Sequence, residues 1–180
     1  MAEAKKYGVS QGRFFAASLP YIAAFFGVLF GGYVSDWLLK KGVSVNVARK
    51  LPVVVGLLMT STIVLANFTT NIPLVLTILS IASFAQGLSN ISWTMLSEVA
   101  PREMVGLAGG VFNFFFANLA GIITPLIIGF IVSATGSYNG GILFVSLVAL
   151  GGALSYIFIV GKIERIQIKT IVRKQKRTQG

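Results

Sequence analysis

The sequence predicts an all-α integral membrane protein with five transmembrane helices. Of its 180 residues, 55% are hydrophobic and only 11% are charged, against the roughly 25% that is usual in soluble domains. Charged residues are absent from three long stretches, residues 14–35, 51–97 and 104–161. Because a helix needs about 20 apolar residues to cross the hydrocarbon core, each stretch is long enough for at least one crossing.

Clusters of turn-forming residues divide the two longer stretches. Asn, Thr and Pro gather at residues 67–73, and residues 134–141 read ATGSYNGG. These breaks give a polar segment at residues 1–13, a transmembrane region at residues 14–162 and a basic tail at residues 163–180. The five predicted spans are residues 14–35, 51–67, 73–97, 104–133 and 141–161. A soluble bundle would need polar outer faces, which the uncharged run of residues 104–161 does not supply.

Positive charge predicts the orientation. If the spans alternate, twelve of the fifteen Lys and Arg residues fall on one side of the membrane, and Lys5, Lys6 and Arg13 fall on the other. The positive-inside bias then predicts a multi-pass protein of the cell membrane with an extracytoplasmic amino terminus and a cytoplasmic carboxyl terminus. No aromatic platform accompanies the basic tail, so it indicates contact with lipid rather than with nucleic acid.

The composition argues against catalysis and bound cofactors. The chain has no Cys and no His, which removes thiolate ligands, the commonest metal ligand and the usual general base. We therefore expect no enzyme activity, no metal site and no cofactor.

Small residues in the first span form a stripe at four-residue spacing: Ala23, Gly27, Gly31 and Ser35. Such stripes let two helix backbones approach closely in lipid. The stripe predicts a partner helix, either inside the bundle or in another membrane protein.

Polar residues of the third span share one helical face. Gln86, Asn90 and Trp93 follow one another at helical spacing, between Ser83 and Ser97. Unpaired amides are costly in hydrocarbon, so this face is predicted to look into protein or water. A polar seam between helices and a wet cavity for an organic solute are both consistent with it.

The fourth span carries Gly109, Asn113, Ala117 and Gly121 at four-residue spacing, and Pro125 is expected to bend it. Cavity lining and ordinary small-residue packing remain alternatives for this span. The fifth span has no strong polar group and is expected to be scaffold.

Two sets of motifs resemble a known family. Residues 31–42, which read GGYVSDWLLKKG, with Ala48-Arg49-Lys50, resemble the cytoplasmic signature loop of the major facilitator superfamily. Residues 87–93, 97–101, 106–110 and 112–115 are similar to the anion:cation symporter branch, whose members carry sugar acids and other organic anions. The resemblance implies that the five spans match helices 8 to 12 of a twelve-helix transporter.

The resemblance also implies functional residues. Substrate contacts would come from Trp93 and Asn113, with Asn90 and Ser92 nearby. These residues coincide with the polar faces described above, so Gln86 on the same face is also a candidate contact. The signature loop, with a gating role, would comprise Gly32, Asp36, Lys40, Lys41 and Arg49. Asp36 is either a latch whose charge pairs differ between states or a solvated helix end.

The implied function is proton-coupled symport of a small organic anion, such as galactonate or glucarate. The chain would act as the carboxyl-terminal part of a transporter, truncated or split and not competent alone. Its partners would be the lipid bilayer, the anion with its proton, and a missing amino-terminal half. All five acids of the chain lie at span ends or beyond, so the missing half would have to carry the proton through the membrane. The alternative is a small autonomous membrane protein that associates with other membrane helices without transport.

Overall fold

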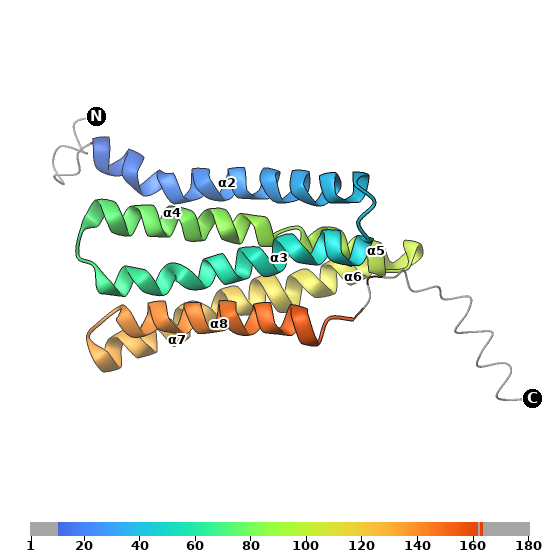
Figure 1. The fold of residues 1–180 in the computed structure, drawn as a ribbon. Helices are drawn as coiled ribbons and strands as arrows, with labels where there is room; N and C mark the ends of the chain where they lie inside the picture. Colours follow the sequence, from blue (N-terminus) through green and yellow to red (C-terminus); the bar gives the residue numbers. More distant parts are fainter. Residues whose placement is uncertain (1–10, 162, 164–180) are drawn as a thin grey trace, which may run out of the picture.

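A computed structural model describes residues 11–161 and 163, and this part of the chain is all helical (Figure 1). The elements in chain order are α2 (Gln11–Lys40), α3 (Val45–Ser61), the 3-10 helix η1 (Thr62–Phe68), α4 (Ile72–Ser89), α5 (Ser92–Val99), the 3-10 helix η2 (Arg102–Met104), α6 (Val105–Phe112), the π-helix η3 (Asn113–Leu119), α7 (Ala120–Thr135) and α8 (Asn139–Phe158).

These elements join into five helical segments that are long and apolar enough to cross a membrane: Ala16–Lys40, Val45–Phe68, Ile72–Val99, Arg102–Thr135 and Asn139–Phe158. The predicted number of spans is therefore confirmed. The bundle end that holds the α2–α3 turn, the α5–η2 turn and the end of α8 is called the basic end here, since Lys40, Lys41 and Arg102 lie there (Figure 1).

Two spans contain interruptions that the sequence did not predict. Between α4 and α5 the backbone N–H of Asn90 donates to the carbonyl of Gly87, three residues back, so the regular α-helical ladder is broken there. In the fourth span the irregular segment is η3, whereas Pro125 lies inside α7. π-helical turns within α-helices are frequent at functional sites.

The small-residue stripe of α2 packs against α4. A Cβ atom added to Gly27 would lie 2.0 Å from the Phe84 carbonyl oxygen, and one added to Gly31 would lie 2.9 Å from that of Leu88. From the other side, a Cβ atom on Gly87 would lie 2.3 Å from the Ala24 carbonyl oxygen. Only glycine permits this approach, so the stripe is occupied within the bundle and is not a free surface for another protein.

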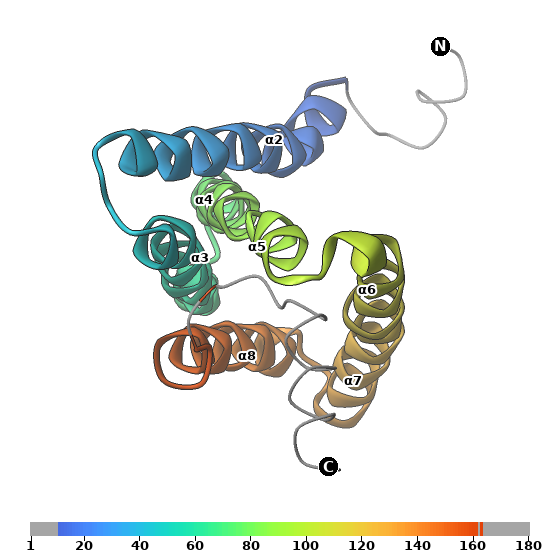
Figure 2. The same cartoon turned by 90° about the vertical axis from the view of Figure 1, so that its right-hand side faces the viewer.

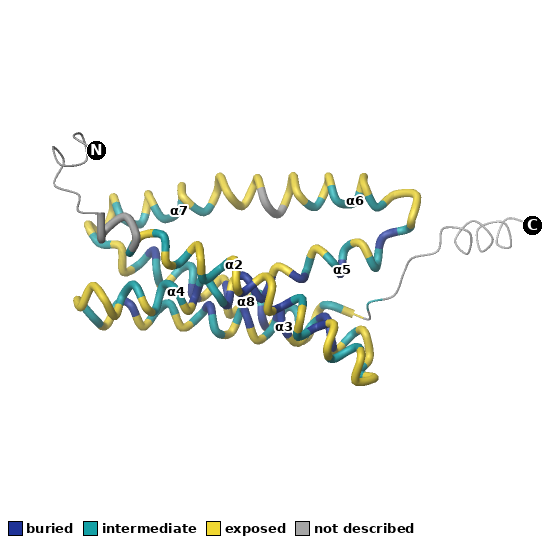
Figure 3. Tube along the Cα trace, turned by 90° about the horizontal axis from the view of Figure 1, so that it is seen from above, coloured by how far each residue is buried: buried dark blue, intermediate teal, exposed yellow. Residues whose placement is uncertain are grey.

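The remaining helices surround a central region. In the end-on view, α3, α8, α7, α6 and α5 follow one another around it, and α2 covers α4 (Figure 2). Buried residues concentrate in α3, α4 and α8, and Val53, Ile91 and Met95 form a buried apolar cluster. The fourth span has no buried position among its described side chains, and its trace is mostly yellow in Figure 3.

Candidate functional site

A central cavity of about 400 Å³ lies where all five spans meet. It includes the break between α4 and α5, so polar residues on both sides of that break face it. The polar and aromatic residues that line this cavity are Gln86, Ser89, Asn90, Ser92, Trp93, Phe112 and Tyr156. No charged side chain of the described residues lines it.

The two amides of the central cavity are available to a solute. The hydroxyl groups of Ser89 and Ser92 are already engaged, since Ser89 donates to the Val53 carbonyl at 3.3 Å and Ser92 donates to the Ser89 carbonyl. Gln86 and Asn90 are exposed, and their side-chain amides have no hydrogen-bond partner within residues 11–161. Each primary amide offers two donors and an acceptor oxygen, a combination that suits vicinal hydroxyl groups.

An aromatic pair fixes the cavity wall on the side of α6. The Trp93 and Phe112 rings meet edge to face, with centroids 5.0 Å apart and an interplanar angle of 73°. Such pairs are worth about 0.5–1.5 kcal/mol beyond their buried area. The contact joins α5 to α6 and holds the indole at the cavity.

The structure brings together four of the five residues predicted to contact substrate, and it leaves out Asn113. Gln86, Asn90, Ser92 and Trp93 line the central cavity, whereas Asn113 is exposed at the start of η3 and does not line it. The directions of adjacent residues on a helix differ by about 100° around the axis. Because Phe112 points to the cavity, Asn113 points away from the cavity, to one side of the helix. The Asn113 carbonyl accepts a hydrogen bond from the Asn118 amide at 3.3 Å.

Tyr156 is a cavity residue that sequence reasoning missed. It lies on α8, the span expected to be scaffold, and its ring also packs against the buried cluster of Val53, Ile91 and Met95. A single Tyr near the end of an apolar span is typical of an interfacial anchor, so no sequence signal indicated the cavity.

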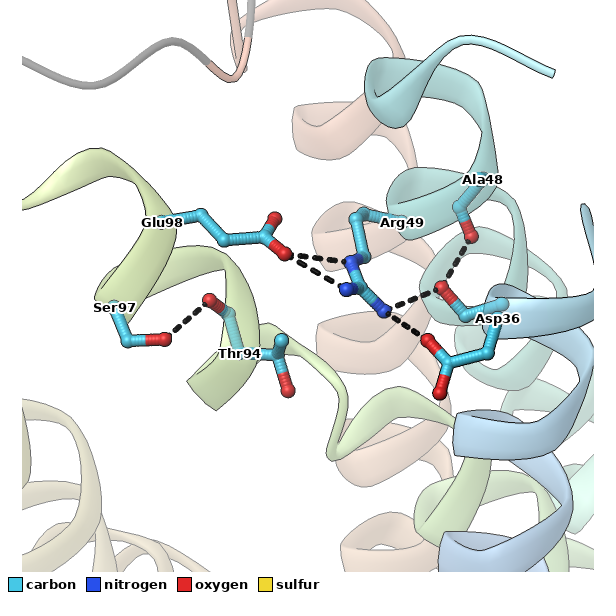
Figure 4. A network of polar contacts seen from close by, with 7 residues as sticks. Asp36, Ala48, Arg49, Thr94, Ser97 and Glu98 are labelled. Atoms are coloured by element: carbon cyan, nitrogen blue, oxygen red, sulfur yellow. Dashed lines mark hydrogen bonds and ion pairs between the residues drawn. The ribbon is translucent and has the colours of Figure 1, made fainter. Parts of the chain in front are cut away.

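A buried arginine organises a second site at the basic end, the Arg49 cluster of Ser35, Asp36, Arg49 and Glu98 (Figure 4). Arg49 Nε and Nη2 donate to Glu98 Oε1 at 3.0 and 2.7 Å, and Nη1 donates to Asp36 Oδ1 and to Ser35 Oγ, each at 3.0 Å. Ser35 in turn donates to the Ala48 carbonyl at 2.9 Å. One guanidinium on α3 therefore ties α2 to α5.

The burial of these groups differs. The Arg49 side chain is 11% exposed and that of Glu98 is 28% exposed, whereas that of Asp36 is 64% exposed. Hydrogen bonds between ionised groups are the strong ones, and they strengthen with desolvation. The Arg49–Glu98 pair is thus the stronger half of the cluster.

The signature-loop residues separate into those inside the cluster and those outside it. Asp36 and Arg49 pair, whereas Lys40 is exposed and the Lys41 ammonium lies 3.7 Å from the centroid of the Trp37 ring, a cation–π contact. The charge partner of Asp36 in this structure is therefore Arg49. Gly32, the remaining signature-loop residue, has open space beside its Cα. Glu98, 49 residues from Arg49, was not predicted as a member.

Neither site has the composition of a metal centre. No group of three or more acidic, His or Cys side chains that could hold a metal ion is found within the described part of the chain.

Comparison with known proteins relates the chain to transporters. It is 45% identical over 153 residues to an Escherichia coli (strain K12) protein named "Probable galactarate/D-glucarate transporter GarP", an alignment that covers 85% of this chain and 34% of that protein. It is 46% identical over 155 residues to a Bacillus subtilis (strain 168) protein named "Probable galactarate/D-glucarate transporter GudP", covering 86% and 34%.

A third relative is the D-galactonate transporter of an E. coli O6:H1 strain, 41% identical over 152 residues, or 84% of this chain and 35% of the relative. No protein-family model matches the chain. The chain thus spans about a third of the length of the curated relatives it matches. These relatives are named as transporters and not as enzymes, and with five apolar spans the chain is a multi-pass membrane protein.

Proposed function

We propose that the chain forms part of a major facilitator transporter of the anion:cation symporter branch, which carries a sugar acid such as galactarate, glucarate or galactonate. The observation that supports this most is the central cavity, where Gln86 and Asn90 present unpartnered amides beside the Trp93 indole. Relatives at 41–46% identity bear the names of sugar-acid transporters, which supports the same substrate class.

The division of labour within the transporter follows from charge. A polyhydroxylated anion offers hydroxyl groups and carboxylates, and the described cavity has neutral partners for the hydroxyls only. The carboxylates and the coupled proton would then be handled by helices that correspond to the other two thirds of the relatives' length. Alternating access needs two helical bundles that rock about a shared site, so this chain would not transport alone.

In this proposal the five spans correspond to helices 8 to 12, the missing amino-terminal half supplies the opposing bundle, and the basic end faces the cytoplasm by the positive-inside bias. Asn113 would contact substrate only once the opposing bundle encloses the exposed face of the fourth span.

The Arg49 cluster would act as a latch at the cytoplasmic end. Its strong half joins α3 to α5, which continues from the break beside the cavity, and its exposed half joins α3 to α2. A change at the α4–α5 break would move Glu98 relative to Arg49, so occupancy of the cavity and pairing in the cluster would be coupled.

A chimera tests the proposal. The matched segment of the E. coli galactarate/D-glucarate relative is replaced by residues of this chain, and uptake of labelled galactarate is measured in cells that lack sugar-acid uptake. We expect uptake that Trp93→Ala or Asn90→Ala lowers at unchanged membrane abundance. Ser97→Ala, away from the cavity, is the matched control. If the chimera reaches the membrane and its uptake is the same with and without Trp93→Ala, the proposed site is wrong. If the chimera reaches the membrane but never transports galactarate, the proposed function is wrong.

A further inference from the structure

A second concave surface lies on the outside of the bundle, between α3 and α8. This α3/α8 groove has a volume of about 330 Å³ and is lined mainly by Asn46, Val47, Lys50, Leu51, Val54 and Ile157. Val47, Leu51 and Ile157 are exposed, so the groove opens away from the central region. In a bilayer such an outward apolar groove faces acyl chains.

Polarity changes along the groove. Asn46 and Lys50 lie in the first two turns of α3, at the basic end. Beyond Lys50, every α3 residue that lines the groove is aliphatic, and the last of them is Val55. At a rise of 1.5 Å per residue, the step from Asn46 to Val55 covers about 13 Å along the helix. The groove is therefore polar at the level of the membrane surface and apolar below it, like a phospholipid.

The polar end has unused hydrogen-bonding capacity. Asn46 Oδ1 is a buried acceptor without a partner among the described residues. The Lys50 ammonium donates to the Val160 carbonyl at the end of α8, which uses one of its three donors. Among the residues that the structure describes, no acidic side chain lines the groove, so none of its described wall residues neutralises Lys50.

We propose that the α3/α8 groove binds one anionic phospholipid, such as phosphatidylglycerol. The phosphate lies against Lys50, and one acyl chain runs down the aliphatic wall. Basic pockets between transmembrane helices are known to hold acidic headgroups. Charge complementarity selects this lipid over phosphatidylcholine, whose headgroup is zwitterionic and places a quaternary ammonium near Lys50.

Native mass spectrometry of the purified chain, released from nanodiscs of equal parts phosphatidylglycerol and phosphatidylcholine, tests the site. We expect the chain to retain phosphatidylglycerol, and Lys50→Gln to lower that retention roughly five-fold without changing the retention of phosphatidylcholine. Lys50→Arg should restore it. Lys41→Gln is the matched control, since Lys41 lies on Trp37 outside the groove.

Leu51→Trp fills the groove and should lower retention of either lipid, which separates loss of the site from loss of charge. Equal retention of phosphatidylglycerol by Lys50→Gln and the unchanged chain would overturn the proposal. Release of lipid-free dimers would also overturn it, because the groove would then be an interface between copies.

Discussion

Replacing Arg49 with methionine should destabilise the bundle strongly. Methionine replaces the apolar stem of the arginine side chain but donates no hydrogen bond, so four bonds to three partners are lost. Glu98 then keeps a charge in a site where it is 28% exposed. The substitution therefore removes the arginine from a desolvated ion pair, and the Glu98 carboxylate loses both hydrogen bonds that Arg49 donates to it.

The magnitude follows from the burial of each partner. Breaking a buried ion pair by removing one member costs about 3–5 kcal/mol. The Glu98 side chain is partly exposed and the Asp36 side chain is 64% exposed, so the cost should lie at the lower end of this range. We expect the free energy of unfolding to fall by about 3 kcal/mol. Asp36→Asn should cost less than about 1 kcal/mol, because exposed pairs contribute little.

Unfolding by sodium dodecyl sulfate in mixed micelles, followed by far-ultraviolet circular dichroism, measures both variants against the unchanged chain. The expected order of destabilisation is Arg49→Met well above Asp36→Asn. An Arg49→Met variant within about 1 kcal/mol of the unchanged chain would mean that the Arg49–Glu98 pair contributes no more than an exposed pair does. An Asp36→Asn variant as unstable as Arg49→Met would mean that the exposed half of the cluster dominates.

Three further predictions concern contacts within the bundle, and the first two use the same unfolding assay. Gly27→Ala should destabilise the bundle by about 1–3 kcal/mol, because its Cβ would meet the Phe84 carbonyl, whereas Gly109→Ala, with open space, should not; equal effects would contradict the tight α2–α4 contact. Ser35→Ala should cost about 1–3 kcal/mol, since this fully buried hydroxyl serves both the Ala48 carbonyl and Arg49, and a neutral result would remove it from the cluster. Phe112→Ala should shift the fluorescence of Trp93 towards the red, measured in a Trp37→Phe background so that Trp93 is the only fluorescent indole. An unchanged spectrum would mean that the Trp93–Phe112 pair does not form.

The sequence predicted those features that depend on residues close together along the chain. Charge-free runs and turn clusters indicated five spans, because lipid tolerates few charges wherever the helices pack. Spacing placed Gln86, Asn90 and Trp93 on one face, and these residues stay together despite the break after Asn90.

Features that depend on tertiary contacts were out of reach. The partnership of Arg49 with Glu98 joins positions 49 residues apart, and periodicity within one helix carries no information about it. Tyr156 reaches the cavity because α8 packs on α3, which its apolar surroundings do not reveal. Spacing within the fourth span could not show whether Asn113 lines the cavity, because its direction depends on the local geometry of η3 and on how that span is rotated.

Protection of a single cysteine by galactarate tests whether the central cavity binds substrate. The chain has no cysteine of its own, so Ser92→Cys in a cysteine-free version of the chimera places one thiol at the cavity wall, and Ser97→Cys serves as the control. The rate of labelling by a membrane-impermeant thiol reagent is measured with and without galactarate. We expect galactarate to slow labelling at residue 92 several-fold and to leave labelling at residue 97 unchanged. Equal rates at residue 92 with and without galactarate would contradict a substrate site in the central cavity.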